Sequence, residues 1–403
     1  MVTPVRDPRV WRSVKTLYLG SGILFLATVG LGVLNVFTSG DLPRGQVLAH
    51  FHSGTIGWVT LSVLATALWV FTGERAVGDR YAGAARLLAW VGPLAVAGYV
   101  AGFYLAFNDL GPFWLLPLFG IPAWLVIVSG FLWTAVELRK QPVVTTPHLL
   151  LMGALLVASL GATMGVLVGL GHAGVVDAFP AAGDPVGSHA GPMDMYLALA
   201  FGAVVELLLL GDPGRRWSRP GMTQMVLGVT SGFVASLALF AGLGALVPVA
   251  LLLFLAAFGF YLGRVGWRVF ARNPVPRPAL WWGGVAFPAY VLLFVYLVAA
   301  YYSQGELPPH RLEVVFAHTT FVALATNLVL AIQSTFAPTT MPRLFQAGVW
   351  TMNGGLLLFF LGEAMAGRPD GALVMGAGIV MALWALWAGL GSARHDAARA
   401  QVV

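Results

Sequence analysis

Histidine recurs in the first turns of three apolar segments. His189 follows His52 by 137 residues, and His318 follows His189 by 129 residues. Each histidine lies near the start of the second apolar segment in a run of four. Ionisable side chains inside a membrane are costly and usually serve a function. Imidazole is the usual axial ligand of a b-type haem, and a low-spin haem takes two imidazoles from facing helices. The spacing therefore predicts a haem site, with His52 and His318 as the pair of ligands.

Two alternatives stay open for these residues. Any of the three histidines can instead cap a helix or form a hydrogen bond at the membrane interface, without binding a cofactor. His50 is a second candidate ligand beside His52. Residues two apart on a helix point about 200° away from each other, so only one of these two can face the helix bundle.

His189 and His172 flank a second candidate site, in a loop between two apolar segments. Aspartate and methionine accompany them in or beside this loop, at Asp177, Asp184, Asp194, Met193 and Met195. Histidine and aspartate suit Zn²⁺ or Cu²⁺, and methionine suits Cu(I). We expect copper or zinc to bind here through His189 and His172. The alternative is a loop of solvated polar residues with no metal.

The composition requires a membrane protein. Of the 403 residues, 59% are hydrophobic and 9% are charged, which is more apolar surface than one soluble core buries. Segments of about 20 apolar residues can each cross a bilayer as a helix. We expect twelve, at 15–38, 50–72, 84–107, 113–138, 148–171, 189–210, 222–243, 246–269, 280–302, 311–333, 344–366 and 370–391. The predicted fold is all-α, with one polytopic domain over 1–403 and a cap at 172–188 on the outer face.

Basic residues predict the orientation. If the N-terminus is cytoplasmic, 19 of the 22 Lys and Arg residues fall on that side, and Arg44, Arg311 and Arg368 fall on the other. Positive charge accumulates in cytoplasmic loops, so both termini are expected inside the inner membrane of a prokaryote, with a histidine-rich layer near the outer face. The net charge of +6 then reflects contact with anionic lipid, and no basic patch with interleaved aromatic residues indicates nucleic acid.

Cysteine is absent from the sequence. Disulfides, thiolate metal sites, iron–sulfur clusters and covalent haem attachment through a C-x-x-C-H motif are therefore excluded. Any redox centre must be held by other side chains, and the haem expected here is haem b.

Two motifs carry a resemblance that extends over nearly the whole chain. The segment 52–58, His-Ser-Gly-Thr-Ile-Gly-Trp, resembles the helix 2 motif of subunit I in the haem-copper oxidase and nitric oxide reductase superfamily. The segment 316–321, Phe-Ala-His-Thr-Thr-Phe, resembles the helix 10 motif, and 189–192 resembles the helix 6 motif that supplies a copper ligand. The resemblance implies twelve helices in three arcs of four, with His52 and His318 as low-spin haem ligands.

The sequence departs from that family where the oxygen-reducing site would lie. Phe316 occupies the position of the high-spin haem ligand, and the seventh apolar segment has no histidine for the copper site. A conventional terminal oxidase is therefore not expected. The chain resembles degenerate members, including the NnrS-like haem- and copper-containing membrane proteins, which implies electron transfer or a response to nitric oxide or redox state, with a quinol or cytochrome as electron donor.

Two other classes of protein remain as alternatives. A membrane transporter also has twelve helices, although its repeats are usually two inverted halves. A haem-binding assembly subunit without redox catalysis is the third possibility. Within the apolar segments, Glu206 and Glu363 are candidates for proton relay or for a position beside a haem propionate, and Asn327, Gln333 and Asn353 are expected to form hydrogen bonds between helices.

Overall fold

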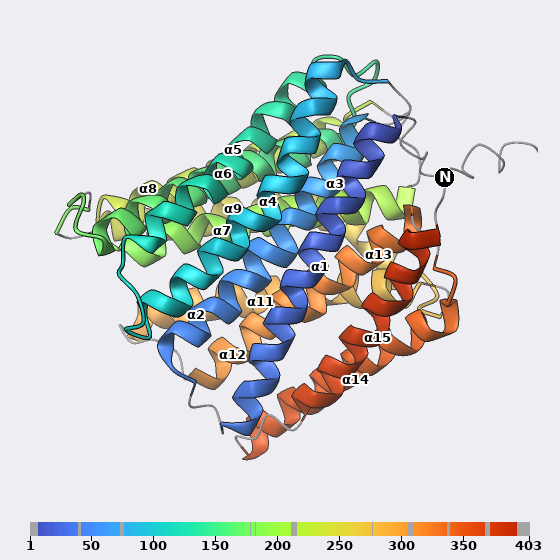
Figure 1. Ribbon diagram of the computed structural model, residues 1–403. Coiled ribbons are helices and arrows are strands. Elements are labelled where there is room, and N and C mark those ends of the chain that lie inside the picture. Colours follow the sequence, from blue (N-terminus) through green and yellow to red (C-terminus); the bar gives the residue numbers. More distant parts are fainter. Residues whose placement is uncertain are drawn as a thin grey trace, which may run out of the picture. The chain divides into compact units, whose positions relative to one another are not determined.

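The computed structural model describes an all-helical chain (Figure 1). It covers residues 7–38, 42–72, 76–177, 179–181, 183–210, 216–275, 277–304, 310–336, 339–366 and 371–392. No strand occurs among these residues. Within these described ranges, fifteen α-helices are joined by three π-helical segments and one 3₁₀ turn.

Most helices begin within a few residues of the predicted positions. Their bounds are α1 (Pro8–Phe37), α2 (Arg44–His52), η1 (Ser53–Thr60), α3 (Leu61–Thr72), α4 (Asp79–Ala106), α5 (Leu115–Leu138), α6 (Thr146–His172), α7 (Pro185–Leu210), α8 (Arg219–Phe240), η2 (Gly244–Leu246), α9 (Val247–Tyr261), η3 (Leu262–Gly266), α10 (Trp267–Phe270), α11 (Pro278–Gln304), α12 (His310–His318), η4 (Thr319–Thr326), α13 (Asn327–Phe336), α14 (Pro342–Ala366) and α15 (Gly371–Ser392).

Twelve of the described helical stretches are long and apolar enough to cross a membrane, which confirms the predicted number. Three of them are composite: α2, η1 and α3 form the second stretch, η2, α9, η3 and α10 the eighth, and α12, η4 and α13 the tenth. The second stretch starts at Arg44, six residues before the predicted 50, so that His52 lies about two turns inside it.

The described residues group into two compact units. Unit 1 ends at residue 24, resumes at 43 and continues to 267, whereas unit 2 holds 25 to 42 and the residues from 268 onward. The predicted pair of haem ligands combines a residue of each unit, because His52 belongs to unit 1 and His318 to unit 2. Each unit is described by itself below.

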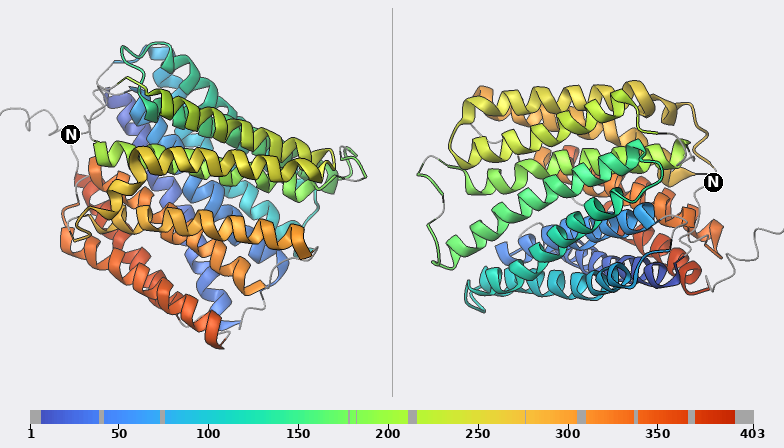
Figure 2. Two further views of the ribbon diagram at one scale, coloured as in Figure 1. Left: turned by 180° about the vertical axis from the view of Figure 1, so that it is seen from behind. Right: turned by 90° about the horizontal axis from the view of Figure 1, so that it is seen from above.

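In unit 1, consecutive helices from α4 to α9 pack against their neighbours along the chain (Figure 1), and Figure 2 shows α8 and α9, in yellow-green and yellow, side by side. Buried hydroxyl pairs connect the first part of α1 to α3, since Ser21 Oγ lies 3.0 Å from Ser62 Oγ and Tyr18 Oη lies 2.8 Å from Thr66 Oγ1. Side-chain hydrogen bonds of this kind, together with close packing, hold helices together in lipid.

The loop between α6 and α7 is shorter than the predicted 172–188 cap. Helix α6 continues to His172 and α7 starts at Pro185, so the connection occupies only 173–184. It lies against the end of α8, where Asp184 N donates to Leu239 O at 2.9 Å and the ring of Phe179 is 5.3 Å from that of Phe240.

In unit 2, α14 and α15 are in direct backbone contact. A Cβ atom added to Gly355 would collide with the backbone of Met375, and one added to Gly378 would collide with the backbone of Met352. Glycine is required at these positions because any side chain would force the two helices apart.

A buried amide pair joins α13 to α14. Asn327 Nδ2 donates to Asn353 Oδ1 at 2.8 Å, and Asn353 Nδ2 donates back to Asn327 Oδ1 at 3.0 Å. These bonds confirm the predicted interhelical role of the two asparagines. Gln333 differs, because its amide is buried and no described residue forms a hydrogen bond with it.

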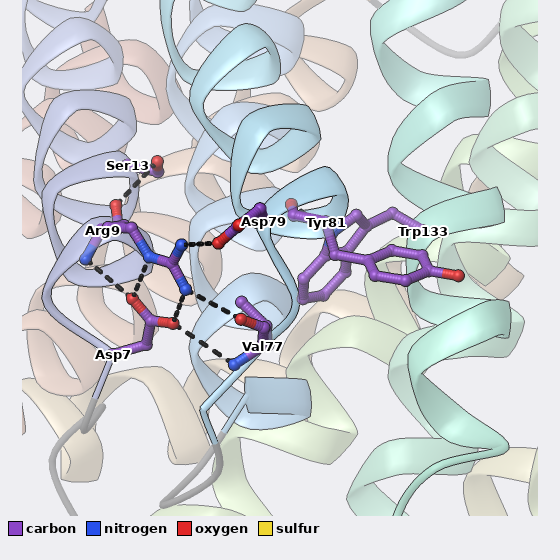
Figure 3. A network of polar contacts seen from close by, with 7 residues as sticks. All are labelled: Asp7, Arg9, Ser13, Val77, Asp79, Tyr81 and Trp133. Carbon is purple, nitrogen blue, oxygen red and sulfur yellow. Dashed lines mark hydrogen bonds and ion pairs between the residues drawn. The ribbon is translucent and has the colours of Figure 1, made fainter.

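The start of α1 is fixed to the start of α4 by an ionic network, drawn in Figure 3. Arg9 donates to both carboxylate oxygens of Asp7, to the carboxylate of Asp79 and to the carbonyl of Val77. Asp7 also accepts from the backbone N–H of Val77 at 3.2 Å. The network therefore joins two helix ends that are far apart in the sequence.

Candidate metal-ligating histidines

His52 is the last residue of α2 and is buried in unit 1. Its Nδ1 lies 2.8 Å from the carbonyl oxygen of Leu48. A carbonyl oxygen only accepts, so Nδ1 carries the proton and Nε2 keeps its lone pair. The ring of Phe103 stacks on the imidazole at 4.0 Å, and Tyr99 meets it edge-on at 5.7 Å. Hydrogen bonding and packing thus fix both the tautomer and the plane of His52.

The helix widens immediately after His52. The eight residues of η1, Ser53–Thr60, form π-helical turns in which each amide reaches one residue farther back than in an α-helix. Thr60 Oγ1 follows the wider spacing and donates to the carbonyl of Thr55, five residues earlier, at 3.0 Å. Such π-helical turns often occur at functional sites.

His318 in unit 2 occupies the equivalent place in an element of the same construction. It is the last residue of the nine-residue α12, as His52 is of the nine-residue α2, and eight π-helical residues follow in both cases. His318 Nδ1 donates to Val314 O at 2.8 Å, and Thr326 Oγ1 donates to Phe321 O, again five residues earlier, at 2.7 Å. The ring of Phe359 lies 4.6 Å from the imidazole.

His189 lies on α7, within unit 1, and faces α6. Its Nδ1 donates to the carbonyl of Gly161 at 2.7 Å, so this imidazole also keeps the lone pair of Nε2. A Cβ atom at Gly165 would lie 2.8 Å from Cε1 of the ring, so the absence of a side chain there makes room for the imidazole. The ring of His189 is 3° from parallel to that of His52, with 6.5 Å between centroids.

The structure does not bring His172 and His189 together. The His189 side chain contacts α6 at Gly161 and Gly165. His172 is the last residue of α6, seven residues beyond Gly165, which corresponds to about 10 Å along the helix axis. His172 is exposed and packs between the rings of Phe107 and Phe113, at 5.5 and 5.8 Å. The two histidines predicted to share copper or zinc therefore belong to different surroundings.

The other candidate residues that the structure describes make packing contacts or backbone hydrogen bonds. His50 is partly exposed on α2, and its carbonyl accepts from Ser53 Oγ at 3.1 Å. Phe316 packs against Tyr290 and Phe294, with ring centroids 5.9 and 6.1 Å apart. The side chain of Glu363 lies outside the described residues.

A buried ion pair was only half predicted. Arg264, in the π-helical η3, donates to both carboxylate oxygens of Glu206 at 3.2 and 2.8 Å and to Gln224 Oε1 at 2.8 Å. The Glu206 and Arg264 side chains are 8% and 13% exposed, so the pair is largely shielded from solvent. Arg264 was counted among the basic residues expected on the cytoplasmic side, although its place inside an apolar segment was the signal that it needed a partner.

Within the described part of the chain, no three His, Cys, Asp or Glu side chains come close enough together to hold a metal ion. The fold defines the class: an all-helical protein with the twelve apolar helices of a multi-pass membrane protein. No family model matches the chain, and a search of curated proteins found no match.

Proposed function

We propose that the chain is a membrane cytochrome that binds b-type haem through His52 and one further histidine that donates Nδ1 to a backbone carbonyl, and that it takes part in electron transfer or in a response to nitric oxide or redox state. The observation that carries the proposal is the hydrogen bond from Nδ1 of His52, His189 and His318 to a backbone carbonyl. Metal-ligating histidines almost always donate their other ring nitrogen in this way, because the bond orients the ring and raises its basicity.

His148 provides the contrast within the same protein. Its Nδ1 pairs with the hydroxyl of Thr145 at 2.6 Å, and its Nε2 pairs with the carbonyl of Val70 at 3.3 Å. Both nitrogens are occupied, and the residue closes a capping box at the start of α6. His52 and His189 differ because no described residue forms a hydrogen bond with their Nε2 atoms.

The donor set fits a haem. Bound haem would supply a one-electron redox centre, and the imidazoles described above would hold its iron. The protein's own contribution is to hold imidazoles in a fixed tautomer and plane, and to surround His52 with the rings of Tyr99 and Phe103, which exclude water. A low-spin centre of this kind supports electron transfer and leaves no open position for oxygen.

The finer architecture and setting belong to the same proposal. We place the twelve helices in three arcs of four, with both termini in the cytoplasm of a prokaryote and the histidines near the outer face of the inner membrane. The bias of Lys and Arg toward one side supports this orientation. The resemblance to subunit I of the haem-copper oxidases implies a quinol or a cytochrome as the electron donor.

The test is the visible spectrum of the purified protein. We expect sharp bands in the reduced form, a pyridine haemochrome of haem b, and loss or conversion of the low-spin spectrum in His52→Ala. The neighbouring variant His50→Ala is the matched control and should retain the spectrum of the parent. A correctly folded but colourless parent protein would refute the proposal and favour the alternative function, a membrane transporter.

A further inference from the structure

We infer that His52 and His189 ligate the same metal centre, as a pair contained entirely within unit 1. This inference rests on the proposed function and names a different partner for His52 from the one predicted from sequence. The two imidazoles come from α2 and α7, and both are held by Nδ1 at a backbone carbonyl. The edge of each ring that carries Nε2 is therefore the edge left for a ligand.

The separation of the two rings fits a shared metal ion. An ion that holds one imidazole on each side, with bonds of about 2.0 Å, sets the ring centroids about 6 Å apart. The observed separation between the two ring centroids is 6.5 Å. Rings in direct stacking contact are closer, as the 4.0 Å between His52 and Phe103 illustrates.

The number of ligands selects haem iron over a bare ion. Structural zinc takes four protein ligands and catalytic zinc takes three. No third His, Cys, Asp or Glu joins the two imidazoles in the described residues. Haem iron already has four nitrogens from the macrocycle and needs two axial ligands, which is the number that His52 and His189 provide.

Glycine on α6 indicates how the second ligand is accommodated. His189 reaches the pair by passing Gly165, where a Cβ atom would lie 2.8 Å from Cε1 and 2.9 Å from Nδ1. The nearest atom to a Cβ at Gly169, one turn farther along α6, would be at 3.6 Å, an ordinary contact. Gly165→Ala should therefore displace the His189 ring while both histidines remain in the chain, and Gly169→Ala should not.

The experiment compares the full-length parent with His52→Ala, His189→Gly, His318→Ala and His172→Ala. Haem and copper content and the reduced and oxidised spectra are measured on monodisperse protein. We expect both the His52 and the His189 variants to lose the low-spin bands, and the His318 and His172 variants to keep them. Free imidazole should restore the bands in His189→Gly, a rescue that a purely structural role would not produce. Gly165→Ala should lower the low-spin fraction relative to Gly169→Ala.

The outcomes distinguish a failure of the shared His52–His189 centre from a failure of haem binding. If haem is bound but His189→Gly keeps the parent spectrum and His318→Ala loses it, the shared centre is refuted while haem binding stands. If the parent contains no haem, the proposed function fails. Copper without haem, lost in both the His52 and the His189 variants, would overturn haem as the occupant.

Discussion

At the scale of single residues, hydrogen bonding divides three helical histidines of unit 1 into two kinds. His148 uses Nδ1 to cap α6 and Nε2 to contact a carbonyl of α3, whereas His52 and His189 use Nδ1 alone. The sequence places all three in or beside apolar segments and does not separate them. Helical periodicity allows only one of His50 and His52 to be buried, and the buried one is His52.

The parallel placement of His52 and His189 could not be predicted from the sequence. It depends on the carbonyl of Gly161 and on the space left at Gly165, which belong to a third helix. Periodicity describes the faces of one helix, whereas this geometry arises from the packing of α2, α6 and α7. The ionic partner of Glu206 was missed for the same reason.

A first prediction concerns Asp7. The hydrogen bonds from Arg9 lower the pKa of the Asp7 carboxyl from 3.8 to about 2. A carboxyl with a lowered folded pKa stabilises the fold above its unfolded pKa, and this contribution disappears as the pH falls through the folded pKa. We expect the attachment of α1 to α4 to weaken between pH 4 and pH 2, measured as lower amide protection at 7–13 and 77–82 after correction for the intrinsic exchange rate at each pH. Asp7→Asn should show the weaker attachment already at pH 7, with little further change on acidification.

A second prediction concerns the ion pair of Glu206 and Arg264. Removal of one partner leaves a buried charge uncompensated, which typically costs about 3–5 kcal/mol. Glu206→Gln and Arg264→Met should each lower the thermal midpoint in detergent, and the double variant should recover much of the loss. Asp79→Asn is the control, because Asp79 is 97% exposed in its contact with Arg9 and should cost little. Additive losses in the double variant would show that the two side chains do not act as a pair.

At the scale of elements, the spanning helices were predictable and their internal turns were not. Twelve apolar stretches stand out because each must cover the thickness of a bilayer with apolar side chains. The π-helical turns at η1 and η4 have no comparable signal in the sequence, because they depend on which carbonyl oxygen each backbone N–H binds. Each wider turn also rotates the following residues, so a helical wheel drawn through His52 fails beyond Ser53.

The third prediction concerns the contact of α14 with α15. Gly355→Ala would push a methyl group into the backbone of Met375, and overpacking of this kind costs about 1–3 kcal/mol. Its neighbour Gly354 faces open space, so Gly354→Ala is a control that differs by one position. We expect a lower midpoint of thermal unfolding in detergent for Gly355→Ala alone. Equal midpoints would mean that the two helices separate at little cost.

At the scale of the whole molecule, the number of membrane crossings follows from hydrophobicity, whereas the orientation follows from charge. The predicted single polytopic domain of 1–403 corresponds to two compact units, a grouping that the hydropathy pattern does not contain. Hydropathy records which segments leave water and says nothing of which helices then associate. That information lies in small residues and hydrogen-bonding side chains such as Asn327 and Asn353.

The fourth prediction tests the orientation. The sequence has no cysteine, so Ala181→Cys and Ala271→Cys each introduce a single thiol at an exposed loop position. A membrane-impermeant maleimide should label Ala181→Cys in intact cells, because the loop between α6 and α7 is expected outside. It should label Ala271→Cys only after permeabilisation. The reverse pattern would invert the proposed topology.

The pairing of Glu206 with Arg264 also determines how the molecule responds to the electric potential across the membrane. The potential acts on net charge, and carrying one elementary charge through the full drop is worth about 2.3 kcal/mol per 100 mV. A carboxylate and a guanidinium joined by two hydrogen bonds carry no net charge, so the field does almost no work when α7 and η3 move together. A variant that keeps only one of the two charges would make the same motion sensitive to voltage.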